Sequence, residues 1–376
     1  MGTPIKTLHL ASYFSGISAV YENIFQSLNK LNVSQTIYVP FRTIKRKKDT
    51  SFLKKDSRVI WRPIFTKLMR FAYFYKIKTV FKDVQKELRV EEQDIIHAHT
   101  WYTDGGVAYK IYKKYDIPYI VTVRSTDISV FAKNFIHLHF FARKILTNAQ
   151  SIVFVSQAYK NAVLNLPFLN DCKSALEAKS HVIPNGVDQF WVKNAKIWKQ
   201  KESEKIKLIF IGNFLKRKNV KRLIEAIDEI ADKQPVSLKI VGGGREYSDE
   251  IVEIVERNEN VNYVGKVYDK HKLSSIIREN DIFVMPSYNE TFGLVYIEAL
   301  SQGLPILYSK NEGIDGFYQE KIGEAVDPFD VGSIVEGILK IYNSYSAYKF
   351  NPNSIVANHN WDKIANQLTQ LYSKSN

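Results

Sequence analysis

Strand-like apolar runs alternate with amphipathic helical patterns from one end of the chain to the other. This alternation predicts an α/β protein in which helices wind around parallel sheets. The expected strands of the first half are Thr7–Ala11, Gln35–Val39, Asp94–Ala98, Tyr119–Val123, Ser151–Val155 and His181–Ile183. Those of the second half are Lys207–Ile211, Ser237–Val241, Val261–Val264, Ile282–Met285 and Pro305–Tyr308.

The two sets of strands predict two Rossmann-like domains that face one another across a cleft. A polar, lysine-rich segment from Phe190 to Glu204 separates the sets. The expected domains are residues 1–188 and 189–356. The amphipathic segment from Asn360 to Tyr372 lies within residues 357–376, and we expect it to form a closing helix that packs back toward the first domain.

One strand–loop–helix segment carries two carboxylates eight residues apart. The apolar run Asp281–Met285 ends at Pro286, and a helical pattern runs from Val295 to Leu300. Glu290 is therefore expected in the loop, and Glu298 about a turn and a half into the helix. In an open α/β sheet such a loop opens into the crevice where ligands bind.

The start of that helix is a predicted anion site. The free backbone N–H groups of Phe292, Gly293 and Leu294 would point at a phosphate. Carboxylates that accept hydroxyl groups, beside amides that bind phosphate, fit a sugar nucleotide.

Composition indicates a packed, cytoplasmic protein. The chain has 376 residues, 45% of them hydrophobic, which is enough for two domains. Its single cysteine, Cys172, excludes an intramolecular disulfide. No apolar run approaches the roughly 20 residues that span a bilayer, and no signal-peptide pattern opens the chain.

The net charge of +14 is concentrated between Arg42 and Arg89, where 16 Lys and Arg accompany only 4 Asp and Glu. The stretch is also rich in aromatic residues, and on a helical wheel Lys67, Arg70, Lys78 and Lys82 fall on one side. Basic and aromatic side chains together favour an anionic membrane surface, at the inner face of the plasma membrane. The alternative is a solvated basic face with the aromatic rings packed inward. Nothing accompanies the charge that is typical of nucleic-acid recognition, so no nucleic-acid partner is expected.

Several motifs, taken together and in this order, resemble the retaining, nucleotide-sugar-dependent glycosyltransferases of the GT-B fold, the group 1 or family 4-like enzymes with an E-x7-E block. The resemblance covers nearly the whole chain. Besides the block from Glu290 to Glu298, it rests on these segments: Asp94–His99, Ser156-Gln157, Val182–Asp188, Ile211–Phe214 through Lys218-Asn219 to Leu223–Ala226, Ile240–Gly244 and Val264-Gly265.

The resemblance implies roles for residues of the second domain, which would bind the donor. Glu290 would hold hydroxyls of the donor hexose, and Glu298 the two hydroxyls of the nucleotide ribose. Lys218 would stabilise the charge of the departing nucleoside diphosphate. Family members usually carry an arginine where this chain has Asn213, so Lys216 or Arg217 would have to compensate. The remaining expected donor contacts are Phe292, Gly293, Leu294, Asn213, Gly212, Gly242, Val267 and, at the hinge, Asn185.

In the first domain, which would bind the acceptor, Gly16, His99 and Asp127 are the expected acceptor or phosphate contacts. Many relatives place a histidine where this chain has Arg124. An arginine cannot act as a base, so Arg124 is expected to clamp a phosphate, with Asp127 as a partner. His97 and His99 are spaced for a metal pair, but two ligands are too few to predict a metal site, and structural histidines are the alternative.

The implied reaction moves a hexosyl group from a nucleoside diphosphate sugar to an acceptor hydroxyl and retains the anomeric configuration. It would need neither a metal nor a cofactor besides the sugar nucleotide. A lipid-linked precursor of a surface polysaccharide is the expected acceptor if the basic stretch binds a membrane. The alternatives are a sugar-nucleotide 2-epimerase of the same architecture and a non-enzymatic basic protein that binds membranes or nucleic acid. Nucleobase, hexose and linkage stay open.

Overall fold

Each half of the chain builds one parallel sheet, in a computed structural model that describes residues 3–14, 19–42, 50–67, 69, 72–197, 204–244 and 248–373. Two compact units result. Unit 1 comprises Met1–Val155, Tyr159–Gly186 and Trp361–Asn376, and unit 2 comprises Ser156–Ala158 and Val187–Asn360. Apart from the three residues Ser156–Ala158, the chain changes unit at 186/187 and at 360/361, whereas the expected second domain ran from 189 to 356.

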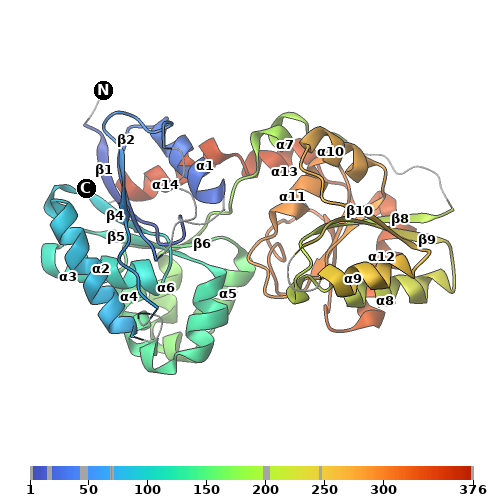
Figure 1. Cartoon of the computed structure of the whole chain (residues 1–376), viewed down its shortest axis with the longest axis horizontal. Helices are drawn as coiled ribbons and strands as arrows, with labels where there is room; N and C mark the ends of the chain where they lie inside the picture. The colour runs from blue at the N-terminus through green and yellow to red at the C-terminus, as the bar shows by residue number, and fades with distance from the viewer. Residues whose placement is uncertain are drawn as a thin grey trace. The chain divides into compact units, whose positions relative to one another are not determined.

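Unit 1 holds a seven-stranded sheet of order β3-β2-β1-β4-β5-β6-β7 (Figure 1). The strands are β1 (Ile5–Leu10), β2 (Val33–Pro40), β3 (Arg58–Arg62), β4 (Ile95–Ala98), β5 (Tyr119–Val123), β6 (Ser151–Phe154) and β7 (Ser180–Val182). Every neighbouring pair is parallel. The edge strand β3 was not predicted, because its short apolar part Val59-Ile60-Trp61 lies between two arginines and none of its residues is fully buried.

Helices cover both faces of this sheet. They are α1 (Ala19–Asn29), α2 (Tyr73–Glu87), α3 (Thr103–Tyr115), α4 (His139–Asn148), α5 (Gln157–Leu164), α6 (Lys173–Ala178) and α14 (Trp361–Ser373), with short helical segments η2 (Val90–Glu92), η3 (Asp127–Ala132), η4 (Ile136–Leu138) and η5 (Pro167–Cys172). Helices α2, α3 and α4 pack over one core cluster, and α1 and α14 over another (Figure 1). The C-terminal helix α14 thus packs on unit 1, as predicted, through Ile364, Leu368 and Leu371.

Unit 2 holds a six-stranded parallel sheet of order β10-β9-β8-β11-β12-β13. Its strands are β8 (Ile206–Gly212), β9 (Val236–Gly242), β10 (Val261–Gly265), β11 (Ile282–Val284), β12 (Ile306–Ser309) and β13 (Gly323–Val326). Its helices are α7 (Gln189–Lys193), α8 (Val220–Ala231), α9 (Ser248–Glu256), α10 (Lys270–Arg278), α11 (Leu294–Ser301), α12 (Val331–Asn343) and α13 (Pro352–Asn358), with η6 (Lys216–Lys218) and η7 (Tyr345–Ala347). Strand β13 was not predicted, because the short edge sequence Gly323–Val326 has no apolar run. The expected linker begins with helix α7, which buries Trp191.

Strand order decides where a site can form in each unit. In unit 1 the chain leaves β1 toward β2 and later returns to β4 on the other side of β1; β8, β9 and β11 repeat this arrangement in unit 2. Loops that leave such neighbouring strands diverge and open a crevice at the carboxyl edge of the sheet. Most of the described predicted site residues lie at or after the ends of β4 and β5 in unit 1 and of β8, β9 and β11 in unit 2, whereas Asn185 follows β7 and Val267 follows β10. None of the helices in the described part of the chain is long and apolar enough to cross a membrane.

Candidate active site

The loop between β11 and α11 is held at both ends by buried contacts. After β11 the chain passes through Met285 and Pro286, both buried. The Tyr296 hydroxyl donates a hydrogen bond of 2.6 Å to the Met285 carbonyl. Helix α11 begins at Leu294, and its N-cap Gly293 has φ of +80°. A Cβ atom at that position would lie 2.5 Å from the Tyr296 ring, so glycine is required there.

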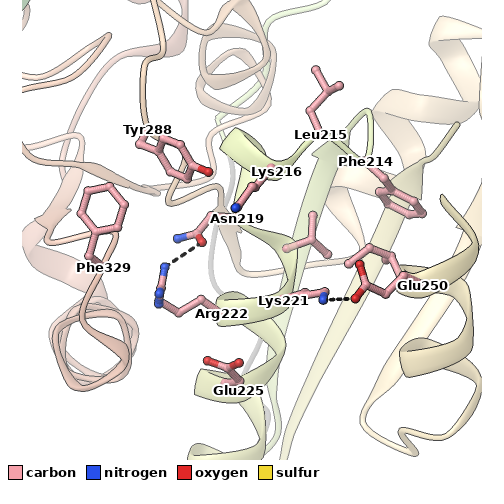
Figure 2. Close-up of a pocket in the computed structure, with 12 residues that line it drawn as sticks. Phe214, Leu215, Lys216, Asn219, Lys221, Arg222, Glu225, Glu250, Tyr288 and Phe329 are labelled. Carbon is pink, nitrogen blue, oxygen red and sulfur yellow. Dashed lines mark hydrogen bonds and ion pairs between the residues drawn. The ribbon is translucent and has the colours of Figure 1, made fainter. Parts of the chain in front are cut away.

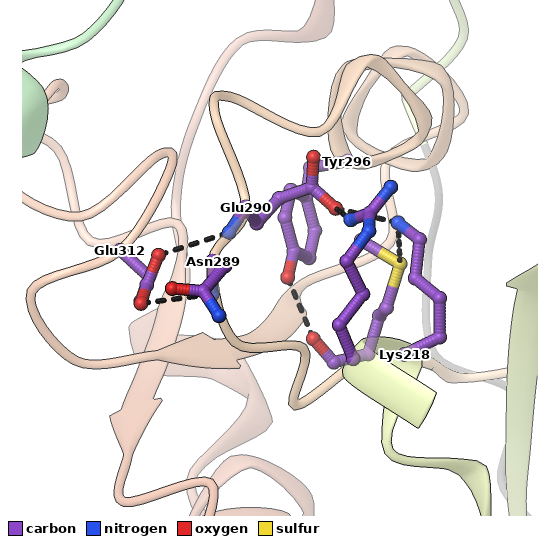
Figure 3. Close-up of polar contacts among 7 residues, drawn as sticks. Lys218, Asn289, Glu290, Tyr296 and Glu312 are labelled. Carbon is purple, nitrogen blue, oxygen red and sulfur yellow. Dashed lines mark hydrogen bonds and ion pairs between the residues drawn. The ribbon is translucent and has the colours of Figure 1, made fainter. Parts of the chain in front are cut away.

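Glu290 is paired with cations from the loop after β8 (Figure 3). Its carboxylate lies 2.5 Å from the Lys218 ammonium and 3.1 Å from the Arg217 guanidinium. The Lys218 and Glu290 side chains are each only 12% exposed. Burial alone would raise the pKa of Glu290, but Lys218 and then Arg217 outweigh it and hold the pKa below its usual value. Arg217 thus supplies a second positive charge beside Lys218, where Asn213 cannot.

The backbone of Glu290 is fixed by residues that the sequence analysis missed. The Glu312 carboxylate accepts the N–H groups of Asn289 at 3.0 Å and of Glu290 at 2.9 Å (Figure 3). The Gly313 N–H donates to the Glu290 carbonyl at 3.0 Å. Both residues follow β12, whose register beside β11 brings the two loops together. No sequence signal marks Glu312, because its role depends on strand order.

Glu298 has different neighbours from Glu290. It lies on α11, half-buried, beside Trp191 and Asp188 of the α7 region and Lys270 of α10. Burial, followed by the negative charge of Asp188, raises the pKa of Glu298 to about 7. Lys270 pairs with Asp188 at 2.5 Å rather than with Glu298. The two carboxylates of the block therefore share one loop and helix but sit in separate electrostatic environments.

Between these carboxylates the chain offers unpaired backbone donors. Within the described residues, the N–H groups of Phe292, Gly293 and Leu294 have no hydrogen-bond acceptor. The Phe292 ring is buried against Phe317 and His359, so this residue can contribute only its backbone to a ligand. A helix N-terminus with free amides attracts an anion.

Glycines allow the carboxyl ends of β8 and β9 to approach closely. Gly242 has φ of +129°, and a Cβ atom on it would lie 1.9 Å from the Gly212 carbonyl oxygen. The Tyr263 hydroxyl donates to the Gly242 carbonyl at 3.1 Å. Asn213 follows β8 and is exposed, and Val267 is half-buried after β10. Unit 2 thus brings most of the predicted donor residues to one edge of its sheet.

In unit 1 the structure groups Arg124, His99 and Asn185. The Arg124 guanidinium donates to the Asn185 side-chain oxygen at 3.2 Å and to the His99 carbonyl at 3.4 Å. These residues border a small hollow of about 30 Å³, the size for a single water molecule. Asn185, expected among the donor contacts, belongs to unit 1 and contacts Arg124 there.

Asp127, expected to contact the acceptor or a phosphate, is 1% exposed, and its side chain binds main-chain N–H groups instead. Its carboxylate accepts the N–H groups of Trp101, Tyr102 and Arg124 at 2.8–3.1 Å. It partners Arg124 through that main-chain N–H, and no hydrogen bond joins it to the guanidinium within the described residues. Burial raises the pKa of Asp127 to about 6 despite these bonds. Gly16, the other expected contact, lies outside the described residues.

His97 and His99 form a buried cluster with a third histidine, His9 of β1, which the sequence analysis missed. His97 hydrogen-bonds to the Tyr372 hydroxyl and to Thr122, both at 2.8 Å. His99 lies 3.1 Å from His9, nitrogen to nitrogen. The three rings could offer nitrogens within 4.8 Å of one another to a metal ion. Burial lowers the pKa of all three rings and so keeps them neutral, the form that can bind a metal. However, both ring nitrogens of His97 already have hydrogen-bond partners, and the adjacent Arg124 charge opposes a cation beside His97 and His99.

A second buried carboxylate also escaped the sequence analysis. Asp104, at the start of α3, is 2% exposed and accepts a hydrogen bond from the Ser12 hydroxyl, which follows β1. Burial raises the pKa of Asp104 to about 7. Asp104 and Ser12 thus add polar groups at the carboxyl edge of the sheet in unit 1.

A hollow of about 410 Å³ in unit 2 lies over the first turns of α8 (Figure 2). The Tyr288 and Phe329 rings lie 5.2 Å apart on one side of it, tilted by 38°, and Lys221 pairs with Glu250 on the other. Of the residues named for the site from the sequence, this hollow is lined by Lys216, the alternative to Arg217, but not by Lys218, Glu290 or Glu298. It adjoins the site through Tyr288, whose N–H donates to the Arg217 carbonyl at 2.9 Å.

The fold and these loops define a glycosyltransferase. The profile of the family described as Glycosyl transferases group 1 matches residues 192–354, and that of Glycosyltransferase Family 4 matches residues 14–189. Between them the two matches take in most of the chain, which belongs to the group 1 glycosyltransferases. Its two Rossmann-like units match solved GT-B structures, so the predicted fold class is confirmed.

Particular relatives span nearly the same length. The putative teichuronic acid biosynthesis glycosyltransferase TuaC of Bacillus subtilis is 22% identical over 362 residues, which are 89% of this chain and 87% of TuaC. Sucrose-phosphate synthase from Thermosynechococcus elongatus superimposes with a TM-score of 0.71 at 21% identity, covering 98% of both chains. Anabaena HepE, solved in complex with UDP and glucose, gives a TM-score of 0.65 at 17% identity, over 98% of this chain and 99% of HepE.

The pairing of Glu290 with Lys218 predicts a measurable coupling. Lys218→Met and Glu290→Gln should each lower the free energy of unfolding of unit 2 by about 1–3 kcal/mol, because each leaves a buried partner unpaired. The double variant should lose less than the sum, with a coupling of about 1–2 kcal/mol in urea denaturation.

Arg217→Met is the matched control for that cycle. Its side chain is 39% exposed, so its coupling to Glu290 should stay below about 1 kcal/mol. Additive effects of Lys218→Met and Glu290→Gln would contradict the pairing.

Proposed function

We propose that this glycosyltransferase moves a hexosyl group from a nucleoside diphosphate sugar to an acceptor hydroxyl with retention of anomeric configuration. The observation that carries the proposal is the ionised Glu290, held by Lys218 and Arg217 in front of the free amides of α11. Cations and amides suit a diphosphate, and a carboxylate suits sugar hydroxyls. The complex of the similar HepE with UDP and glucose supports this choice of donor.

In this proposal the donor occupies unit 2 in a defined order. Glu298 accepts hydrogen bonds from the ribose diol, the α11 amides bind the diphosphate, and Glu290 accepts hydroxyls of the hexose. Binding of the sugar loosens the Lys218–Glu290 pair and turns the Lys218 ammonium toward the leaving phosphate.

The bond from the anomeric carbon to the diphosphate oxygen breaks on the face where the acceptor hydroxyl attacks. The new glycosidic bond forms on that same face, and the departing phosphate takes the hydroxyl proton. No protein base is needed, and Lys218 and Arg217 take the place of a metal ion.

Unit 1 is the proposed acceptor domain, with Arg124 as its central cation. Its guanidinium already contacts Asn185 and the His99 carbonyl, and it stacks over Tyr21 at 5.5 Å. A guanidinium held in this way can bind a phosphate of the acceptor with two parallel hydrogen bonds.

A lipid-linked acceptor is proposed from a patch on unit 1. Helix α2 exposes Phe74 and Tyr75 by 51% and 62%, and α4 exposes Phe140 by 70%. The exposed Lys78 and Lys82 lie one helical turn apart on α2, and Lys144 covers the Phe140 ring. We call these residues the basic aromatic patch. The TuaC name supports a polysaccharide precursor as the product.

The structure modifies the expected membrane face in two respects. Helix α2 begins at Tyr73, so Lys67 lies outside it, and Arg70 is outside the described residues. Of the aromatic residues in the stretch, Trp61 stacks inward on Phe14, and Phe65 lies beneath Lys76. The exposed Phe140 ring of α4 compensates, although it follows the basic stretch by more than fifty residues in the sequence.

Donor turnover tests the proposal directly. Purified protein is incubated with UDP-, GDP- and ADP-sugars in buffer that contains EDTA, and hydrolysis, transfer and epimerisation are followed by chromatography. We expect slow hydrolysis of one donor without any epimer, and at least a 100-fold loss in Glu290→Ala. The exposed Glu320→Ala is the control with unchanged turnover, and thermal unfolding checks that both variants fold. An epimeric sugar nucleotide, or full activity of Glu290→Ala, would contradict the proposal.

Donor affinity should depend on pH through Glu298. An ionised carboxylate accepts both ribose hydroxyls, whereas the protonated form loses one acceptor. Because the pKa of Glu298 is about 7, its carboxylate is mostly ionised above that pH, where it binds the ribose well, and mostly protonated below it, where it binds the ribose poorly. Donor affinity should therefore rise about tenfold from pH 6 to pH 8. Calorimetry with the sugar nucleotide measures this change. Glu298→Gln should remove it, and a variant that keeps the wild-type slope would exclude Glu298 as its source.

Membrane binding is tested by flotation with vesicles. The protein should float with anionic vesicles at low salt and be released at high salt, since each basic residue contributes about 1 kcal/mol near such a surface. Phe74→Ser with Phe140→Ser should reduce the bound fraction about tenfold. Phe329→Ser, which alters an exposed ring of unit 2, is the matched control. If the protein did not float with anionic vesicles at low salt, the proposal of a lipid-linked acceptor would be contradicted.

A further inference from the structure

The loop after β12 folds back onto the loop that carries Glu290. Strands β11 and β12 are parallel neighbours, with Phe283 opposite Ile306 and Val284 opposite Leu307. Their carboxyl ends therefore lie side by side, and residues 309–316 reach the peptide bonds of Asn289 and Glu290. This contact joins segments that are more than twenty residues apart in the sequence.

Glu312 uses both carboxylate oxygens in this contact. Oε1 accepts the Asn289 N–H at 3.0 Å, and Oε2 accepts the Glu290 N–H at 2.9 Å. Two neighbouring N–H groups that converge on one carboxylate form a charge-assisted pair of bonds. A glutamine could accept only one of them, because its amide nitrogen has no lone pair to offer the other.

The same loop fixes the other side of the Glu290 peptide. The Gly313 N–H donates to the Glu290 carbonyl at 3.0 Å. Gly313 has φ of +44°, and a Cβ atom on it would lie 2.9 Å from the Phe292 carbonyl oxygen. The backbone of Glu290 is thus held from both directions by two consecutive residues of one loop.

This hold places the chain in a conformation that it would otherwise avoid. Asn289 has φ of +54°, in the left-handed region that is uncommon for residues other than glycine. Immediately after it, the Glu290 side chain reaches Lys218 and Arg217. Without the Glu312 bonds, nothing else among the described contacts ties the N–H groups of Asn289 and Glu290 in place.

We propose that Glu312 is a positioning residue, which fixes the Glu290 backbone so that the Glu290 carboxylate stays in register with Lys218 and with the donor sugar. Its effect on the sugar rests on the function proposed above, whereas its effect on the Lys218–Glu290 pair does not. Glu312 touches neither donor nor acceptor; it acts through Glu290. The nucleotide end of the donor, at Glu298 and the α11 amides, has separate supports.

The chain offers a matched control in the same loop. Asp315 accepts the Asn311 N–H at 2.7 Å, another bond from a carboxylate to the backbone, but it does not touch Glu290. Glu312→Ala and Asp315→Ala therefore remove similar bonds from one loop. Only the first should disturb Glu290.

The first experiment needs no donor. The unfolding coupling between Lys218→Met and Glu290→Gln is measured in wild type, in Glu312→Ala and in Asp315→Ala. We expect the coupling to fall by at least half in Glu312→Ala and to persist in Asp315→Ala. An unchanged coupling in Glu312→Ala, or an equal loss in both variants, would overturn the proposal whether or not the wild type turns over a donor.

The second experiment separates sugar from nucleotide. With the donor that the wild type hydrolyses, Glu312→Ala should lose about 30-fold or more in kcat/KM and Glu312→Gln about tenfold. Affinity for the nucleoside diphosphate alone, by calorimetry, should change less than twofold. If Glu312→Ala lost affinity for the nucleoside diphosphate as strongly as it lost kcat/KM, Glu312 would have only a general structural role and the proposal would be overturned. A wild type inactive on every donor would refute the proposed function, and the coupling measurement would still decide the role of Glu312.

Discussion

The ion pair between Glu290 and Lys218 is the interaction on which the rest of the site depends. A carboxylate that is 12% exposed stays ionised only if nearby positive charges compensate for the hydration free energy that it loses on burial. Lys218 and Arg217 supply that charge, and they come from the loop after β8, while Glu290 follows β11. These strands are neighbours in the sheet only because the chain reverses its direction of winding at β8. The strand order thus brings the charged side chains of Glu290, Lys218 and Arg217 together at the carboxyl edge of the sheet.

A charged pair is also costly if either partner is misplaced, so the loops around it are unusually well fixed. Glycine is required at Gly293 and Gly313 by the close approach of Tyr296 and of the Phe292 carbonyl. The Asn219 side chain donates to the carbonyls of Pro286 and Pro328, and so ties the start of α8 to the loop after β11. Each of these contacts links segments distant in sequence. Within the described residues the N–H groups of Phe292, Gly293 and Leu294 at the start of α11 remain without acceptors, which is the condition for binding an anion there.

Much of this could be predicted from the sequence, because it depends on local pattern. The buried strands, the loop–helix position of Glu290 and Glu298, and the closing helix α14 follow from apolar periodicity and turn residues. The edge strands β3 and β13 were missed because edge strands bury little and carry charged residues. Glu312, Asp104 and His9 were missed for another reason. Their partners lie on neighbouring strands, and no spacing within one segment reveals them.

Arg124 and Asn185 show the limit of a family motif as a guide. Asn185 matches the family pattern and Arg124 stands where many relatives have a histidine, but their mutual hydrogen bond depends on how the segments after β5 and β7 meet. The pKa values of the two glutamates of the E-x7-E block also depend on contacts that the motif does not reveal. Cations lower the pKa of Glu290, whereas burial and Asp188 raise that of Glu298 to about 7. One sequence motif therefore supplies one carboxylate whose ionised form is favoured and one that titrates near neutral pH. In the proposed function the first would face the sugar beside the reacting bond and the second the ribose, whose hydroxyls would favour the ionised form of Glu298.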